Sequence, residues 1–425
     1  MSAKKNVVIA QSGGPTAVIN NTLRGIIETC RMFPETFGTV YAGFHGIEGI
    51  LKEELLNLSR QKAEEIAFLR TTPAAGVIGT CRYKLKPDQK EDFQRVVKVF
   101  QAHQVGYFFY IGGNDSMDTA DKISALALEE GLDLVAVGVA KTIDNDLGDP
   151  DFKLVDHTPG YGSVARYWSH IIQNLNEENR GSSPSDPVLV VQTMGREVGF
   201  IAASARLGDP DREMPLQIYL PESGRTLEKL ASNVNDELRR SGRCIVVISE
   251  GFDVGAIGKT QDAFGHTAYS SSRQTAQQTV VNYLNHVGLQ ARGQVPGTAQ
   301  RDAMIYASVV DLEEAYRLGQ NAVAIAVNYG SGFMSTLRRK SGIIYDVEYD
   351  KVPLKIVANS ERKFPRRWIT PGGKDVTDDF INYARPLIGN DWVSVPLVDG
   401  RQRFARPEKI FAEQKLTPYV PQAYR

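Results

Sequence analysis

Short apolar runs that end directly in glycine-rich or acidic loops are the most restrictive feature of this sequence. Residues 6–10, 107–111 and 134–140 are such runs, and each leads into a segment rich in Gly, Asp, Asn, Ser or Thr. Helical patterns separate the runs, and this alternation is typical of a parallel sheet with crossover helices. Ligands of such sheets bind outside the carboxyl ends of the strands. The sequence therefore predicts an α/β fold whose chemistry lies at one edge of a sheet.

The later part of the chain repeats this organisation. Residues 188–191, 244–248 and 322–327 are further apolar runs that we expect to be strands. A chain of 425 residues is long enough for about two or three domains. We predict two Rossmann-like, mostly parallel-sheet domains with the active site in the cleft between them. The first would comprise residues 1–157 and about 302–350, and the second residues 158–301 and about 351–425, which include a C-terminal extension.

The charge balance argues against some classes of partner. The chain has 49 Lys and Arg against 50 Asp and Glu, a net charge of −1, so we expect no nucleic-acid partner. The N-terminal Met-Ser-Ala-Lys-Lys precedes only a short apolar run, so we expect no signal peptide and no membrane contact. Cys30, Cys81 and Cys244 are far apart and odd in number, which favours reduced thiols and a cytoplasmic location.

Two of the loops have the composition of phosphate-binding sites. Residues 11–16 read Gln-Ser-Gly-Gly-Pro-Thr, and residues 112–116 read Gly-Gly-Asn-Asp-Ser. A glycine pair lets the backbone approach a ligand closely, and a helix that follows presents its positive amino terminus to an anion. We expect Ser116 to cap such a helix over residues 117–130.

The loop after residues 134–140 carries the residues best suited to catalysis. It reads Lys-Thr-Ile-Asp-Asn-Asp from Lys141 to Asp146. Asp144 and Asp146 would face the same side of an extended chain, so one could accept a hydroxyl proton while the other organises the loop or a metal. The alternative is a plain turn rich in Asp and Asn. A calcium loop is excluded because Gly148 stands at the fifth position, where a ligand is needed.

Asp115 and Lys141 bear on the identity of a phosphoryl donor. A carboxylate in a phosphate loop repels its own ligand, unless a cation intervenes or the repulsion serves to exclude a competing ligand. Lys141 offers a compact positive charge that suits a small, highly charged donor such as pyrophosphate. The alternative is a simple ion pair between the two side chains.

Two later segments follow strands and could bind a sugar phosphate. Met194-Gly195-Arg196 follows residues 188–191, and its arginine could grip phosphate oxygens. Glu250 follows residues 244–248 and could accept hydrogen bonds from sugar hydroxyls, with helix capping or solvent exposure as the alternative.

Two basic clusters lie nearer the C-terminus. Arg292, Thr298 and Arg301 surround a Pro-Gly pair and could bind an anion, although a solvated basic loop has the same spacing. The second cluster is more typical of a solvated face, so we assign it no role. It consists of Arg362, Lys363, Arg366 and Arg367.

Taken in order, these motifs resemble the 6-phosphofructokinase family. The resemblance runs from residue 6 to about 330 and returns at residues 373–387, which look like the tail of the longer, pyrophosphate-dependent members. Thr-Ile-Asp-Asn-Asp at residues 142–146 is highly specific, whereas the other motifs gain weight from their order. They are Gly13-Gly14, Gly79-Thr-Cys-Arg82, Gly112-Gly-Asn-Asp-Ser116, Met194-Gly-Arg196, Glu250 and Thr298-Ala-Gln-Arg301.

The resemblance implies a reversible transfer of phosphate from Mg²⁺-pyrophosphate to the 1-hydroxyl of fructose 6-phosphate, within a homo-oligomer (dimer or tetramer). Members that use ATP typically have glycine at the positions of Asp115 and Lys141, so the resemblance favours pyrophosphate. Asp115 would occupy the place of the nucleotide's α-phosphate, and Lys141 would stabilise the phosphate that leaves. The alternatives are an ATP-dependent 6-phosphofructokinase, an enzyme similar to NAD kinase, and a noncatalytic subunit that only binds sugar phosphates.

The resemblance also implies roles for individual residues. The catalytic residues would be Asp144 as the base, with Lys141, Asp115 and Arg196. The sugar phosphate would be held by Thr142, Ile143, Asp144, Met194, Gly195, Arg196, Glu250, Thr298 and Arg301, and by Arg292 from a neighbouring subunit. Gly13, Arg82 and Gly113 would bind the phosphoryl donor, and Asn114 would help to hold magnesium.

Three positions depart from the family's pattern. Asn114 stands where the family usually has aspartate, so Asp144 or the donor oxygens would carry the metal. Pro187 stands where many relatives have an arginine from the adjacent subunit, and Thr298 replaces a frequent histidine. We expect these changes to make the site less specific, so that it also accepts other sugar phosphates such as sedoheptulose 7-phosphate.

Overall fold

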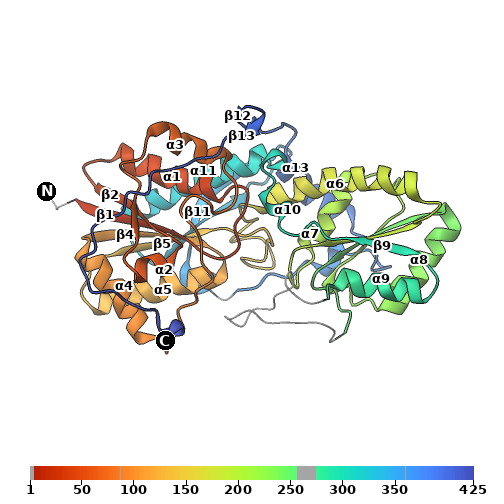
Figure 1. Ribbon diagram of the computed structural model, residues 1–425, viewed down its shortest axis with the longest axis horizontal. Helices are drawn as coiled ribbons and strands as arrows, with labels where there is room; N and C mark the ends of the chain where they lie inside the picture. Colours follow the sequence, from red (N-terminus) through yellow and green to blue (C-terminus); the bar gives the residue numbers. More distant parts are fainter. Residues whose placement is uncertain (1–3, 87, 256–273, 359) are drawn as a thin grey trace.

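The computed structural model describes residues 4–86, 88–255, 274–358 and 360–425. Figure 1 shows two lobes that lie side by side along the long axis, each built around its own sheet. The predicted α/β fold with two mostly parallel sheets is therefore confirmed.

The first lobe contains a seven-stranded sheet in the order β11-β10-β5-β4-β1-β2-β3. Its central strands β2, β1, β4, β5 and β10 are parallel, and the edge strands β3 and β11 are antiparallel to their neighbours. The expected strands at residues 6–10, 107–111 and 134–140 are β1, β4 and β5. The bounds are β1 Lys5–Gln11, β2 Phe37–Gly43, β3 Leu55–Asn57, β4 Val105–Gly112, β5 Val135–Ala140, β10 Phe333–Arg339 and β11 Val347–Pro353.

Helices cover both faces of this sheet because successive strand residues point to opposite sides. Val7 and Ile9 pack with α1 and α11, whereas Val8 and Ala10 pack with α2, α4 and α5. The helices of this lobe are α1 Ile19–Met32, α2 Ile47–Leu51, α3 Ala63–Phe68, α4 Lys90–Ala102, α5 Asn114–Glu129, α11 Val309–Asn328 and α12 Leu354–Val357.

The second lobe contains a four-stranded parallel sheet in the order β7-β8-β6-β9. Helices α6 and α13 pack on one face, and α8 and α9 pack on the other. Strands β6 and β8 are the expected strands at residues 188–191 and 244–248. The bounds are α6 Tyr161–Ser182, β6 Val188–Thr193, α7 Phe200–Ala203, β7 Leu216–Tyr219, α8 Leu227–Ser241, β8 Cys244–Ser249, α9 Ala276–His286, β9 Ala291–Gln294, α10 Ala299–Asp302 and α13 Asp378–Ile388.

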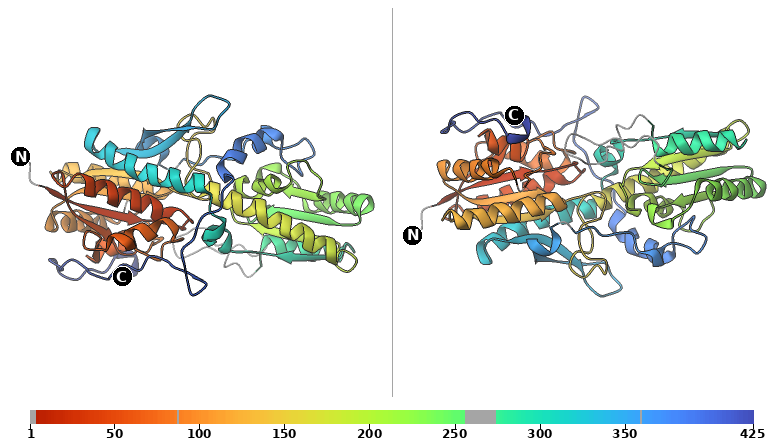
Figure 2. Two further views of the ribbon diagram at one scale, coloured as in Figure 1. Left: turned by 90° about the horizontal axis from the view of Figure 1, so that it is seen from above. Right: turned by 90° about the horizontal axis from the view of Figure 1, so that it is seen from below.

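The two lobes are joined where the amino termini of α6 and α11 meet. The backbone N–H groups of Gly160 and Ser163 donate to the Asp311 carboxylate at 2.9 and 2.8 Å, so one residue of α11 satisfies the first turn of α6. Figure 2 shows these two helices running in opposite directions from this junction, one into each lobe.

The last residues of the chain return to the first lobe. A short hairpin (β12 Leu397–Val398 and β13 Arg401–Gln402) precedes this return. Phe411 forms an antiparallel bridge with Leu56, and the Glu53 carboxylate accepts hydrogen bonds from the backbone N–H groups of Lys415 and Leu416. The predicted domain boundaries remain a prediction, and these contacts associate the extreme C-terminus with the first sheet.

Two local expectations are wrong. Residues 322–327 are not a strand but the last part of α11, where Ala322, Val323, Ile325 and Ala326 pack against α1 and the sheet while Val327 is exposed. Ser116 does not cap a helix, because α5 already begins at Asn114 and Gly113 is its N-cap residue.

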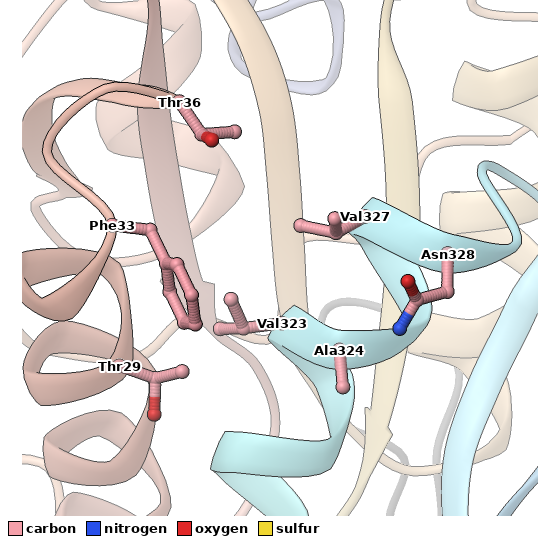
Figure 3. Close-up of a pocket in the computed structure, with 7 residues that line it drawn as sticks. All are labelled: Thr29, Phe33, Thr36, Val323, Ala324, Val327 and Asn328. Atoms are coloured by element: carbon pink, nitrogen blue, oxygen red, sulfur yellow. The ribbon is translucent and has the colours of Figure 1, made fainter.

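Helices α1 and α11 are in close contact at one point and enclose a cavity further along their length. A Cβ atom on Gly25 would stand 2.2 Å from the carbonyl oxygen of Tyr316, and one on Gly319 would stand 2.3 Å from that of Thr22. Only glycine therefore fits at the crossing. Toward the carboxyl ends lies an apolar cavity of about 210 Å³ (Figure 3), lined by Thr29, Phe33, Thr36, Val323, Ala324, Val327 and Asn328.

None of the described helices combines the length and the apolar character needed to cross a membrane.

Candidate active site

Three loops of the first lobe meet at the carboxyl ends of β1, β4 and β5. The backbone N–H of Gly13 donates to the carbonyl oxygen of Cys81 at 2.9 Å, and the backbone N–H of Lys141 donates to that of Gly112 at 3.0 Å. The Lys141 ammonium donates to the carbonyl oxygens of Ser12 and Gly14 at 2.8 and 2.7 Å. Lys141 thus ties its own loop to the glycine-rich loop after β1.

The environment of Lys141 is unusual for a lysine. Its side chain is buried, and this burial lowers its pKa to about 7, with the positive charges of Arg196 and Arg301 acting in the same direction. A buried ammonium held by carbonyl oxygens alone has spare attraction for an anion.

Asp115 forms a salt bridge with a residue that sequence analysis missed. The Lys84 ammonium lies 2.6 Å from the Asp115 carboxylate, and both side chains are partly exposed. Lys84 follows Arg82 by two residues, so it belongs to the same segment as one of the predicted donor-binding residues. The alternative of a simple Lys141–Asp115 ion pair is not what the structure has, because the Lys141 ammonium donates its hydrogen bonds to carbonyl oxygens.

Asp144 and Asp146 flank a residue in the left-handed region. Asn145 has a φ of +57° and is fully buried. Its side-chain oxygen accepts from the backbone N–H of Thr158 at 3.2 Å, and its amide donates to the Tyr383 hydroxyl at 3.0 Å. The segment is therefore a turn, as one alternative supposed, but a turn that holds two carboxylates in fixed positions.

The two carboxylates of this turn differ in their surroundings. Asp144 is only 9% exposed, and its carboxylate lies 3.7 Å from the Arg196 guanidinium. Burial, together with the neighbouring charge of Asp144, raises the pKa of Asp146 to about 6.

The second lobe contributes Arg196 and Glu250 to the same space. The backbone N–H of Arg196 donates to the Glu250 carboxylate at 3.0 Å, so Glu250 neither caps a helix nor faces solvent. Burial raises the pKa of Glu250 to about 7, and the nearby charge of Asp144 acts in the same direction. A Cβ atom on Gly251 would stand 2.0 Å from the carbonyl oxygen of Arg196, so the close approach of these two loops requires glycine.

Arg301 reaches from the second lobe to the first. One of its terminal nitrogens lies 2.8 Å from where a Cβ atom on Gly14 would stand, so the Arg301 side chain closely approaches the glycine-rich loop after β1. Next to it, the Gln300 side chain accepts hydrogen bonds from the backbone N–H of Met194 and from the Trp168 indole at 3.0 and 2.9 Å. Gln300 thus anchors the Met194 loop, and nothing in its sequence context signalled that role.

Comparison with known proteins decides the family. The family model described as Phosphofructokinase matches residues 6–326, about three quarters of the chain. The chain belongs to the phosphofructokinase family.

Individual phosphofructokinases resemble the chain over nearly its full length. Pyrophosphate–fructose 6-phosphate 1-phosphotransferase of Methylococcus capsulatus is 38% identical, with 92% of this chain and 93% of the relative covered. The enzyme of the same name from Halomonas elongata is 37% identical over 98% and 99%. The crystal structure of a pyrophosphate-dependent phosphofructokinase from Marinobacter aquaeolei superposes with a TM-score of 0.87 at 35% identity, over 98% and 99% of the two chains.

Arg292 is the predicted site residue of this phosphofructokinase that lies apart from the others. It pairs with Leu189 at the start of β6, whereas Met194 follows the end of that strand. Its guanidinium contacts Glu178 and donates to the Ser182 hydroxyl at 3.1 Å, both near the far end of α6. Because α6 extends about 30 Å, a role for Arg292 at this site requires a second chain.

The remaining predicted residues of this phosphofructokinase lie around the three loops. Gly113 and Asn114 begin α5, and Arg82 is exposed two residues before Lys84. Thr142 accepts a hydrogen bond from the backbone N–H of Asp144 at 3.1 Å. The Ile143 side chain packs in the core of the second lobe, so its backbone alone is available to a ligand. Gly195 adopts a φ of +124°, and Thr298 immediately precedes α10.

One member of the basic cluster near the C-terminus is not solvated. Lys363, Arg366 and Arg367 are exposed, as predicted, but Arg362 is only 1% exposed. The prediction is wrong for Arg362 because its guanidinium is satisfied by buried oxygen atoms around Asn145.

Proposed function

We propose that this phosphofructokinase transfers phosphate reversibly from pyrophosphate to the 1-hydroxyl of fructose 6-phosphate, giving fructose 1,6-bisphosphate and phosphate. The single observation that carries the proposal is the juxtaposition of Asp144 with the Arg196 guanidinium at 3.7 Å, beside the buried ammonium of Lys141. The two relatives named above each match more than nine tenths of the chain, and their names describe the same reaction.

Asp144 is the base in this proposal. It accepts the proton of the sugar's 1-hydroxyl as the oxygen attacks the terminal phosphorus of pyrophosphate. The Arg196 guanidinium lies 3.7 Å from the Asp144 carboxylate, so a cation stands beside the group that would accept the proton. Phosphoryl transfer depends chiefly on such positioning and on cations around the transferring group.

Lys141, Arg196 and Arg301 are those cations. The charges of Arg196 and Arg301 both lower the pKa of Lys141, which supports their closeness in space. Lys141 would stabilise the phosphate that leaves, since among the described residues its ammonium donates hydrogen bonds to carbonyl oxygens only. Gly13, Arg82 and Gly113 would bind the donor beside it.

Donor choice is proposed to rest on Asp115 and Lys141. The Asp115 carboxylate stands in the first turn of α5, where a helix amino terminus would otherwise attract a nucleotide phosphate. Its negative charge, held there by Lys84, disfavours a larger polyphosphate and leaves room for pyrophosphate. An ATP-dependent reaction is the alternative.

The donor is proposed to bind together with Mg²⁺. The side-chain oxygen of Asn114 is buried, and it has no hydrogen-bond partner among the described residues, so it offers a free oxygen ligand. The described residues contain no group of three or more His, Cys, Asp or Glu arranged around one metal position. A metal bound by few protein ligands and by the donor's own oxygens fits this pattern, and it would neutralise charge on the pyrophosphate.

The sugar phosphate is proposed to bind on the side of the second lobe. Met194, Gly195, Arg196 and Glu250 would contact the sugar, and Thr298 and Arg301 its 6-phosphate. Arg292 would reach a site on a neighbouring chain, which supports a dimer or tetramer, because within its own chain it lies at the opposite end of β6. The three cysteines are unpaired and buried, which supports action in the reducing cytoplasm.

The proposal is tested by measuring fructose 1,6-bisphosphate formation from fructose 6-phosphate and Mg²⁺, with pyrophosphate and ATP in separate reactions. Turnover with pyrophosphate is expected. Turnover with ATP alone would overturn the donor assignment, and no turnover with either would overturn the proposed reaction. Sedoheptulose 7-phosphate serves as a second acceptor, on which we expect activity because Thr298 replaces a histidine and Pro187 an arginine.

A further inference from the structure

Arg362 is a buried arginine on the segment that crosses between the lobes. The chain leaves β11 through α12, which packs on α5 in the first lobe, and it enters the core of the second lobe at Phe364. The backbone N–H of Phe364 donates to the Glu222 carboxylate at 2.9 Å, which fixes the far end of the crossing. Arg362 thus lies between two anchored points, outside the residues 6–326 that the family model matches.

Two of the three guanidinium nitrogens of Arg362 bind Asn145, between the two carboxylates, and the third binds the segment that follows. Nε donates to the carbonyl oxygen of Asn145 at 3.1 Å, and one terminal nitrogen donates to the Asn145 side-chain oxygen at 3.0 Å. The other donates to the carbonyl oxygen of Val155 at 2.7 Å. The backbone N–H of Arg362 also donates to the carbonyl oxygen of Asp146, at 2.6 Å. One residue therefore fixes both the turn and the segment that leaves it.

The partners of this guanidinium are carbonyl and amide oxygens rather than a carboxylate. Its flat face lies over the Phe152 ring, 4.2 Å from the centroid, and its charge interacts with Asp146, Asp149 and Asp156 only through space. A buried cation without a contacting carboxylate is costly to retain. If the position only had to be filled, a neutral side chain would be sufficient. A planar guanidinium can in addition donate to the peptide oxygen and the side-chain oxygen of one residue at the same time.

We propose that Arg362 is a positioning residue for phosphoryl transfer, which holds the left-handed turn at Asn145 so that Asp144 meets the sugar hydroxyl. The inference rests on the proposed function. Asparagine tolerates the left-handed region better than most L-residues, but the right-handed conformation is still the more favourable one, so the turn would relax without its buried partners. Because Asn145 stands between Asp144 and Asp146, any rotation of its backbone redirects both carboxylates. Among the described residues, the sugar-binding groups of the second lobe form no hydrogen bond, ion pair or ring contact with Arg362, so they would keep their positions.

The test compares Arg362→Lys and Arg362→Met with Lys363→Gln, a matched removal of the neighbouring exposed cation. We expect kcat with pyrophosphate to fall by about 10- to 100-fold in Arg362→Lys and further in Arg362→Met, since each lost hydrogen bond to a charged donor costs about a tenfold factor or more. The KM for fructose 6-phosphate should stay within about threefold, and Lys363→Gln should match the parent. A folded Arg362→Lys protein with unchanged kcat would overturn the inference. So would a KM for fructose 6-phosphate that rises by the same factor as kcat falls.

Asn145→Gly keeps the inference testable if the arginine variants fail to fold. Glycine adopts the left-handed conformation freely but lacks the side-chain oxygen that Arg362 binds, and it also loses the hydrogen bonds of the Asn145 side chain to Thr158 and Tyr383. We expect it to lower kcat less than Arg362→Lys, and the loss in the double variant to be smaller than the product of the two single losses, because both changes remove the hydrogen bond between Arg362 and the Asn145 side chain. Additive losses would contradict a shared role.

Hydrogen exchange separates this inference from the proposed reaction. If the parent enzyme does not use pyrophosphate, the proposed function fails, but Arg362→Lys should still raise amide exchange selectively in a peptide over residues 141–158. Lys363→Gln should leave that peptide unchanged. Exchange that is unaltered, or raised equally throughout the protein, would overturn the positioning role itself.

Discussion

The two walls of the candidate site are built in opposite ways. On the first lobe, Asn145 is fully buried and hydrogen-bonded on its backbone and side chain. On the second lobe, the Arg196 side chain is 55% exposed and lies 3.7 Å from its nearest carboxylate partner, a loose salt bridge. The first-lobe wall, which carries Asp144 and Asn145, is fixed before substrate binds. The second-lobe wall, which carries Arg196 and Glu250 and is called the cationic wall below, can adjust to a phosphate.

This contrast has a physical origin. Buried polar groups must be paired, and several pairings at once leave one conformation for the turn. An exposed guanidinium is instead solvated, and a single contact fixes it weakly. Changes to the fixed wall should therefore lower kcat, while changes to the cationic wall should act mainly on KM.

The largest effect is expected from Asp144→Asn. This near-isosteric change removes the proton acceptor and leaves the turn's backbone in place, so kcat should fall by about 100- to 10,000-fold. Steady-state assays with pyrophosphate measure kcat, and calorimetry measures fructose 6-phosphate binding, which should change only about threefold. A kcat within tenfold of the parent would refute the assignment of the base and with it the contrast between the walls.

The next effect concerns pyrophosphate affinity and pH. Burial lowers the pKa of Lys141 to about 7, so the free enzyme loses this positive charge as the pH rises through that value. Pyrophosphate binds the protonated form, and its affinity should fall by about tenfold for each pH unit above 7. The dissociation constant of pyrophosphate is measured at each pH for the parent and for Lys141→Met. The titration of pyrophosphate affects both proteins equally, so it cancels in the ratio of the two constants. A ratio that stays constant from pH 7 to 9 would contradict the role of Lys141.

A third, smaller effect tests donor exclusion. Replacing Asp115 and Lys141 together with glycine removes the carboxylate that faces the donor, so ATP affinity should rise by about tenfold while pyrophosphate affinity falls. Competition by ATP in a pyrophosphate-binding assay measures both. Lys84→Met is the control, because it releases the partner of Asp115 but retains the repelling carboxylate. Unchanged exclusion of ATP in the double variant would count against this explanation.

The smallest effect is expected from Glu250→Gln on the cationic wall. The amide can still accept from the backbone N–H of Arg196, so the loop should survive. The KM for fructose 6-phosphate should rise by about fivefold, as for loss of one hydrogen bond to a charged group, with kcat nearly constant. A large drop in kcat in Glu250→Gln would show that the second-lobe wall is as rigid as the first-lobe wall.

Much of the fold followed from sequence because the strands are short, apolar and bounded by glycine-rich loops. The run at residues 322–327 misled because buried helices and buried strands share apolar composition, and its place inside a 20-residue helix shows only through contacts with α1. The candidate site was predictable where chemistry sits next to a strand, as with Asp144 and Lys141.

The missed residues lack such local signals. Arg362 stands beside three exposed basic residues, and only the folded chain brings it against Asn145, more than 200 positions away. Lys84 and Gln300 lie close to the predicted site residues Arg82 and Arg301, but nothing in their residue type or spacing marks the contacts that they make. Their contributions come from long-range contacts, which residue type and spacing do not encode.

The order of strands also has a consequence for synthesis on the ribosome. The four-stranded sheet uses one continuous stretch, residues 188–294, but the larger sheet adds β10 and β11 to the edge of β5 only after that stretch has been made. At typical translation rates β5 waits on the order of ten seconds or more for its partner strand. The lobe that leaves the ribosome first is thus the last to be completed, and until then the edge of β5 lacks the strand that covers it in the folded protein.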